Sequence, residues 1–202
     1  MKIVSVLKKI KKSIKKSIKR TIHYYYVMYA DSTELLEKAQ EKLHPLPEGL
    51  RMVKLTYENS HLYQCKIDDK DKMLHFSVDG ESWVVVDEDN TIVAFHYGTY
   101  RGTQSIFYNV KNCDFEHVSI QVAKKYQRKG IALHLLYHTV KNLKYDDVRS
   151  KRLGTCIKPS NEKSIKLHEL IGFKKSHRVF LIHIRRKKDG QYTFINIPRY
   201  NI

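Results

Sequence analysis

The spacing of hydrophobic residues changes along the chain and outlines a series of strands and helices. Apolar residues at every second position predict strands, whereas apolar residues three or four apart predict helices. The polar residues 87–90 separate two of the strands as a turn. The pattern predicts strands at residues 50–56, 82–86, 91–97, 117–122 and 153–158, a helical stretch near 60–67, helices at 131–143 and 161–170, and a hairpin of residues 179–184 and 192–197 around Asp189 and Gly190. This order indicates a mixed α/β (α+β) fold.

Residues 1–22 have a pattern of their own. Nine Lys or Arg residues and no acidic residue occur there. Hydrophobic residues recur every three or four positions, which predicts a helix with one apolar stripe; they are Ile3, Leu7, Ile10, Ile14, Ile18 and Ile22. A basic amphipathic helix is typical of a segment that lies on an anionic membrane surface. Contact with a protein or nucleic acid, and a disordered basic tail, remain open as alternatives.

The length of 202 residues favours one domain with an extension. We expect an N-terminal helix (1–22), an extension (23–49) and a main domain (50–202). Within the extension, the tyrosine-rich residues 24–29 predict a packed strand, although tyrosine rings also suit a membrane interface. Asp31 can cap the helix that follows, and prolines after residue 44 end it.

The positive charge narrows the choice of partners. The formal net charge is +17, and residues 1–22 hold nine of these charges. Such a surface attracts nucleic acid, anionic lipid or acidic ligands. Cys65, Cys113 and Cys156 lack the spacing of a metal site and cannot all pair, which favours a reducing compartment. No apolar run approaches the roughly 18 residues that a transmembrane helix needs.

The turn between the strand at 117–122 and the helix at 131–143 carries the strongest functional signal. Gly130 lacks a Cβ, so backbone can approach a ligand there. The first N–H groups of a helix are unpaired and the helix dipole favours an anion. Such a turn can hold a diphosphate, although a short strand-to-helix loop has a similar composition. Its residues are Gln127, Arg128, Lys129, Gly130, Ile131 and Ala132.

This turn resembles the first motif of the GNAT family of acyl-CoA N-acyltransferases. That motif is Gln or Arg, two residues, Gly, one residue, and Gly or Ala, and it is matched by Gln127, Gly130 and Ala132. The family's second motif is an Asn, a small residue, an aromatic residue and a closing Gly-Phe. It is matched, with a His where Tyr is common, by Asn161, Ser164, His168, Gly172 and Phe173. The resemblance covers about residues 50–190.

The resemblance implies the GNAT fold, with a twisted mixed sheet of about seven strands and helices on both faces. It also implies a V-shaped opening between the central strands, where acetyl-CoA or another short acyl-CoA would bind. The pantetheine arm would pair with backbone near Val122 as an added strand does. Asn161 could equally be a helix cap. The other residues that the resemblance places at the cofactor are Gln127, Arg128, Lys129, Gly130, Ile131, Ala132 and Ser164.

Glu116 is the candidate base, because an amine must lose a proton before it attacks a thioester. In some GNAT members a base Glu stands at this distance before the Gln of the turn. Strict strand alternation places Glu116 on one apolar face with Val118, Ile120 and Val122, where burial would raise the pKa of its carboxyl group. A solvent-exposed strand end is the simpler interpretation, and His117, on the other face, is the neighbouring alternative.

His168 is the candidate acid, since it stands where the family often has a Tyr that donates to the leaving thiolate. A histidine can donate when it is protonated or in the right tautomer. A histidine that makes only a structural hydrogen bond is the alternative. We interpret Cys156 as a buried, inert thiol rather than as a nucleophile.

The acyl acceptor is not identified by the sequence. The basic N-terminal segment suggests an amine met at the inner face of a membrane by a cytoplasmic, peripheral enzyme. An amino sugar, as a nucleotide sugar or lipid-linked precursor, suits that setting, and the front end weakly resembles GNAT proteins of surface-polysaccharide pathways. Aminoacyl-tRNA or a protein amine is the alternative acceptor. A non-enzymatic module that binds membrane or nucleic acid on a GNAT fold is a further alternative.

Overall fold

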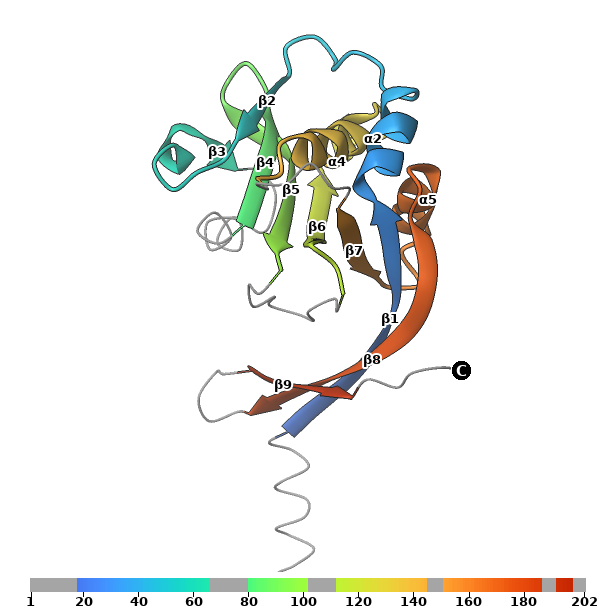
Figure 1. Ribbon diagram of the computed structural model, residues 1–202. Helices are drawn as coiled ribbons and strands as arrows, with labels where there is room; N and C mark the ends of the chain where they lie inside the picture. Colours follow the sequence, from blue (N-terminus) through green and yellow to red (C-terminus); the bar gives the residue numbers. More distant parts are fainter. Residues whose placement is uncertain (1–17, 66–79, 102–111, 145–150, 187–191, 198–202) are drawn as a thin grey trace, which may run out of the picture.

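The computed structural model describes residues 18–65, 80–101, 112–144, 151–186 and 192–197. Within them, three α-helices accompany one sheet of nine strands (Figure 1). In chain order the elements are β1 (Ile18–Asp31), α2 (Ser32–Gln40), β2 (Arg51–Lys54), β3 (Gln64–Cys65), β4 (Gly80–Val86), β5 (Thr91–Tyr100), β6 (Phe115–Val122), α4 (Ile131–Lys141), β7 (Arg152–Ile157), α5 (Glu162–Leu170), β8 (Lys174–Arg186) and β9 (Tyr192–Ile197).

The sheet mixes parallel and antiparallel pairs, so the mixed α/β fold class is confirmed. Its strand order is β2-β4-β5-β6-β7-β1-β8-β9, and β3 pairs with β5 beside this path. The sheet exceeds the expected seven strands because the N-terminal β1 and the short β3 both join it. The helical stretch expected near residue 60 is a single 3₁₀ turn, Ser60–Leu62, which leads into β3. The turn expected at Asp189 and Gly190 lies outside the described residues.

The N-terminal strand occupies an interior position in the sheet. β1 pairs antiparallel with β7 on one side and with β8 on the other, from Ile18 opposite Arg186 onward. The strand predicted at residues 24–29 is confirmed, but the helix predicted for residues 1–22 is wrong at residues 18–22. The reason is that the four-residue spacing of Ile18 and Ile22 fits a strand as well as a helix. Residues 1–17 lie outside the described part.

The helices begin at the positions that the sequence indicates. The Asp31 carboxylate accepts hydrogen bonds from the N–H groups of Thr33 (2.9 Å) and Glu34 (3.2 Å), which caps α2. α4 begins after Gly130, which takes a left-handed conformation with φ +74°. Among the residues that the structure describes, no helix is both long and apolar enough to span the hydrocarbon core of a membrane.

One hydrophobic cluster joins all three helices to the central strands. Leu35 of α2, Leu136 of α4 and Ile165 of α5 meet Met28 of β1 and Leu153 of β7 there. Figure 1 shows α4 and α2 lying across the upper half of the sheet. Because β1 contributes to this cluster, the residues treated as an extension from the sequence are built into the same core as the main domain.

Candidate active site

The sheet divides between β6 and β7. These parallel strands pair over only three positions, ending at His117 opposite Thr155. Beyond that point β6 continues along β5 to Val122, and β7 continues along β1 to Ile157. The two strands therefore separate toward their carboxyl ends.

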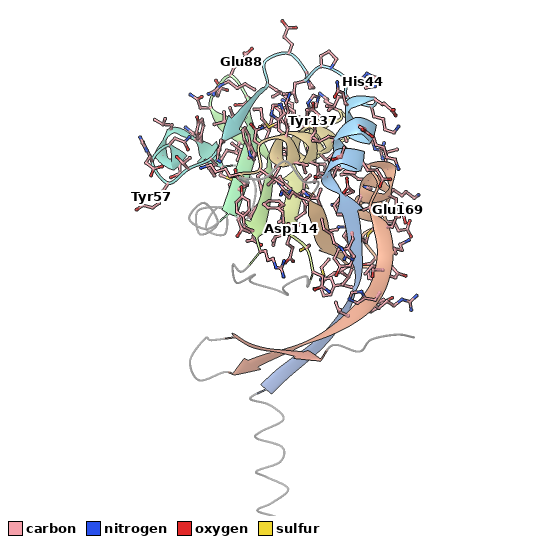
Figure 2. The ribbon with its side chains drawn as sticks, in the orientation of Figure 1. His44, Tyr57, Glu88, Asp114, Tyr137 and Glu169 are labelled. Atoms are coloured by element: carbon pink, nitrogen blue, oxygen red, sulfur yellow. The ribbon has the colours of Figure 1, made fainter. Side chains whose placement is uncertain are left out.

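Asp114, labelled in Figure 2, fastens the closed end of this division. Its backbone N–H donates to the carbonyl of Arg152 (2.7 Å), and its carboxylate accepts from the N–H of Arg152 (2.9 Å). The opening is thus fixed at one end by backbone pairing and by these two bonds. This is the V-shaped opening that the family resemblance implies.

A cavity of about 440 Å³ occupies the division. Its walls come from β5, β6, β7, α5 and, unexpectedly, β1. The candidate residues Glu116, Asn161, Ser164 and His168 all line it; the other lining residues are Tyr25, His96, His117, Val118, Ser119, Ile120, Gln121, Thr155, Cys156, Ile157 and Lys158. Tyr25 could not be assigned to the site from the sequence, because its position depends on β1 pairing with β7 more than a hundred residues away.

The turn at residues 127–132 has the geometry of an anion site. Arg128 and Gly130 both have positive φ angles, +63° and +74°. Among the described residues, the backbone N–H groups of residues 128–132 donate no hydrogen bond. A Cβ built on Gly130 would meet no atom within 4 Å, so the space in front of the turn is open. Unpaired N–H groups in a left-handed turn at a helix start favour a phosphate group.

The turn is tied to the end of β6. The side-chain amide of Gln127 donates to the carbonyl of Val122 at 3.1 Å. This bond holds the loop against the strand edge along which the division opens. Gln127 therefore positions the turn, and it does not itself line the cavity.

Glu116 does not share a face with Ile120 and Val122, contrary to the alternation expected from the sequence. The pairing of β5 with β6 shifts by one residue between Tyr97 and Gly98, which leaves Val118 as an extra residue in β6. Such a bulge resets the alternation of side chains. Phe115 and Ile120 consequently lie in the same cluster, and the adjacent Glu116 points to the opposite face. Glu116 nevertheless lines the cavity, and it is only 7% exposed to solvent.

The α5 helix brings Asn161, Ser164 and His168 to one side of the cavity. The Asn161 side chain caps the helix by accepting from the N–H of Ser164 at 3.3 Å. His168 is 2% exposed, and its Nδ1 lies 2.7 Å from the carbonyl of Ser164. A carbonyl only accepts, so this nitrogen carries a proton and donates. Burial lowers the pKa of His168 to about 4.

Two further histidines line the cavity. His96 of β5 and His117 of β6 are buried side by side, with His96 Nε2 and His117 Nδ1 2.8 Å apart. His117 appeared only as an alternative to Glu116, and His96 looked like a strand residue. Pairing across β5 and β6 is what brings them together.

Cys156 lies in the cavity wall as a thiol. Burial raises its pKa well above the ordinary value, and the nearby Glu116 raises it further. A protonated thiol is a poor nucleophile. The position therefore agrees with the inert interpretation.

Comparisons with known proteins place this fold and site in one family. The sequence model of the acetyltransferase (GNAT) family matches residues 46–173. The chain belongs to the GNAT acetyltransferase family. The matched range of this GNAT chain contains the turn, the division and α5, whereas β1 and α2 precede it. Comparison with curated proteins finds no match.

Solved GNAT structures have a similar fold. A tandem GNAT protein from the clavulanic acid biosynthesis pathway has 11% identity and a TM-score of 0.57, over 83% of this chain and 55% of that one. A GNAT acetyltransferase from Novosphingobium aromaticivorans has 14% identity and a TM-score of 0.52, over 85% and 69%. A glucosamine N-acetyltransferase region of a fungal multi-domain β-N-acetylglucosaminidase has 14% identity and a TM-score of 0.52. The match covers 87% of this chain and 22% of that one. The chain thus spans little more than half of the tandem protein.

Proposed function

We propose that this protein transfers an acyl group, in the first instance acetyl, from a CoA thioester to an amine. The observation that carries the proposal is the open N–H turn at residues 127–132, tied by Gln127 to the strand along which the cavity opens. A donor with a diphosphate at the turn and an extended arm along β6 would have its thioester at the cavity. Family membership supports the same reaction class.

Each predicted cofactor residue has a role in this proposal. The backbone N–H groups of Arg128, Lys129, Gly130, Ile131 and Ala132 would hold the diphosphate, with the Arg128 and Lys129 side chains adding positive charge. The edge of β6 that leaves β7 before Val122 offers backbone groups to the pantetheine amides. Asn161 and Ser164 would face the arm from α5. CoA supplies the activated acyl group, and the chain supplies position and proton transfer.

Glu116 is the proposed acceptor for the proton that an incoming ammonium group must lose. A nearly buried carboxylate in the cavity wall would also attract that positive charge. His168 is a less direct acid than the sequence suggested. Because its N–H already donates to Ser164 and burial keeps the ring neutral, it would have to gain a proton at Nε2 before it could donate to sulfur.

For the acceptor we propose an amino sugar, presented as a nucleotide sugar or a lipid-linked precursor. The positive surface suits a sugar diphosphate. One protein of similar fold is a glucosamine N-acetyltransferase region, which is a reason to begin a substrate search with glucosamine. Aminoacyl-tRNA and protein amines are the second candidate class, supported by the same charge.

The donor site is tested by thermal unfolding with acetyl-CoA, CoA and desulfo-CoA, followed by an amine panel. A ligand present at about 100 times its Kd should stabilise the fold by roughly 2.7 kcal/mol. The panel contains glucosamine, UDP-glucosamine, a polyamine, a lysine peptide, an aminoglycoside and aminoacyl-tRNA, and thiol release reports turnover. Stabilisation without turnover of any amine would favour a CoA-binding module, and no stabilisation at high CoA would remove the donor site.

We also propose that the basic segment before β1 meets an anionic membrane. Seven of the nine cationic residues of residues 1–22 lie in this segment and support the proposal. Because β1 begins at Ile18, the informative deletion removes residues 1–17 and leaves the sheet intact. We expect it to abolish sedimentation with phosphatidylglycerol vesicles and to leave turnover of a soluble amine unchanged. Undiminished sedimentation of the shortened chain would refute the membrane proposal.

A further inference from the structure

Three buried side chains form a hydrogen-bonded chain that leads from the cavity wall to α4. His117 of β6 is 3% exposed, His96 of β5 is 1% exposed and Thr139 of α4 is fully buried. His117 Nδ1 lies 2.8 Å from His96 Nε2, and His96 Nδ1 lies 2.9 Å from Thr139 Oγ1. Of these three residues, His117 and His96 line the cavity and Thr139 does not. The chain therefore connects the site to the interior of the fold.

The direction of each hydrogen bond follows from the Thr139 end. The Thr139 hydroxyl donates its single proton to the carbonyl of Leu135 at 2.8 Å. Its oxygen therefore accepts from His96, which places the His96 proton on Nδ1. Burial lowers the pKa of His96 to about 3, so the ring is neutral and its Nε2 carries a lone pair. That nitrogen accepts from His117, and the proton of His117 is consequently on Nδ1.

His117 Nε2 is thus left as an acceptor. Within the described residues it has no hydrogen-bond partner, although it is buried. An unpaired buried acceptor costs about 1–3 kcal/mol, and such a group in a native fold calls for an explanation, of which a catalytic role is one. The rings of Phe115 and Phe173 pack edge-on against the imidazole, with centroids 5.2 and 5.7 Å away, and hold it in the cavity wall.

The titratable groups that face His117 across the cavity wall keep it neutral. His96 faces it from β5, and His168 faces it from α5 with ring centroids 6.5 Å apart. Burial, then His96 and His168, lower the pKa of His117 well below its ordinary value. Glu116 is adjacent on β6 but on the opposite face. Nε2 is therefore unprotonated throughout the neutral pH range. Because the atom itself is buried, a small shift of the cavity wall must bring it to the reacting groups.

We propose that His117 Nε2 carries a proton from the acceptor nitrogen to the CoA sulfur during acyl transfer. This inference rests on the proposed function. The amine nitrogen gives its electron pair to the carbonyl carbon and loses a proton to His117 as the C–N bond forms. The electron pair of the C–S bond leaves with the sulfur, which takes that proton from His117 and becomes the thiol. His117 ends neutral, and no oxidant, reductant or net proton is required.

The lowered pKa of the ring favours the second half of this step, because the protonated ring is a strong acid toward the leaving sulfur. A nitrogen that is forming an amide bond holds its proton weakly, so a weak base can remove it. A thiolate holds a proton much more strongly than His117 does. His96 and Thr139 act as positioning residues: they fix the tautomer that presents Nε2, and His96 stabilises the transient imidazolium by accepting from Nδ1–H.

The tautomer is tested first, on the full chain with ¹⁵N-labelled histidine. Two-bond ¹H–¹⁵N spectra should show His117, His96 and His168 neutral, with the proton on Nδ1, across the neutral pH range. Thr139→Val should shift His117 and His96 toward a mixture of tautomers, whereas Thr139→Ser should not. This measurement needs neither a known acceptor nor a bound donor. A proton on Nε2 of His117 in the wild-type chain would overturn the proposal.

Turnover of acetyl-CoA with the best amine of the panel tests the proton transfer. We expect His117→Gln to lower kcat by about 100-fold or more, with unchanged stabilisation by CoA. Added imidazole should restore at least part of the activity of His117→Ala, which a purely structural histidine would not allow. His138→Gln, at a half-buried position of α4 that does not line the cavity, is the matched control and should retain activity.

The outcomes separate this inference from the proposed function. Wild-type kcat in His117→Gln, or no restoration by imidazole with CoA binding intact, would overturn the shuttle and leave acyl transfer standing. Absence of any turnover by the wild-type chain would instead contradict the proposed function, and the tautomer spectra would still decide the orientation of His117. If the His117 variants do not fold, Thr139→Val decides: wild-type kcat with an altered tautomer would refute the shuttle.

Discussion

Gly130→Asp is expected to abolish stabilisation by acetyl-CoA, whereas Gly130→Asn should retain part of it. The two side chains have nearly the same shape and both tolerate the left-handed conformation that φ +74° requires. They differ in charge, and a carboxylate in front of N–H groups that bind a diphosphate repels the ligand. We expect at least a hundredfold rise in Kd for Asp, equivalent to roughly 2.7 kcal/mol of lost stabilisation.

The effect should arise at the ligand and not in the fold. A Cβ at Gly130 meets no protein atom within 4 Å, so neither substitution disturbs packing. Gly49 offers a control, because its φ of +75° imposes the same backbone strain at a position outside the turn at residues 127–132. A Cβ there would also meet the flexible side chain of Glu88 at 2.9 Å. Gly49→Asn should lower the unfolding temperature of the free protein without changing the shift that acetyl-CoA causes. Equal CoA-induced shifts in Gly130→Asp and the wild type would contradict a phosphate site at this turn.

The local elements of the fold could be predicted from the sequence because their patterns are local. The turn at Gly130, the cap at Asp31 and the strand with its Val84–Val86 run depend on neighbouring residues alone. The position of β1 could not be predicted, since it depends on pairing with β7 and β8, which lie more than a hundred residues away in sequence. The spacing of Ile18 and Ile22 is the particular point where one pattern is compatible with two structures.

In the candidate site, too, some residues could be predicted from local sequence patterns and others could not. The residues of the turn and of α5 were found because two short motifs carry them. Tyr25, His96 and Thr139 come from separate elements, and none has a neighbour in sequence that marks it. The bulge at Val118 was also invisible, because it depends on the shift in register against β5. It is this bulge that sends Glu116 and Ile120 to different faces of the sheet.

Glu116→Gln is expected to lower kcat by about 100-fold or more while stabilisation by CoA is retained. The substitution preserves shape at a residue that is only 7% exposed and removes the charge that would accept the ammonium proton. Its effect should shrink as the pH rises toward the pKa of the acceptor amine, because more of the amine then arrives already neutral. The loss in His117→Gln should persist at high pH, since its proton leaves only as the amide bond forms.

Glu81 provides a matched control for Glu116, because it is a second buried glutamate but not part of the cavity wall. Its carboxylate pairs with Lys54 at 2.6 Å and accepts from the Tyr100 hydroxyl at 2.8 Å. Removing one partner of a buried pair is destabilising, so Glu81→Gln should lower the free energy of unfolding and leave kcat unchanged. For Glu116→Gln, the rise in the activation free energy should exceed the loss in the free energy of unfolding. If Glu116→Gln has the same kcat as the wild type at every pH, the carboxylate takes no part in proton transfer. Of the two proposed proton acceptors, only His117 would then remain.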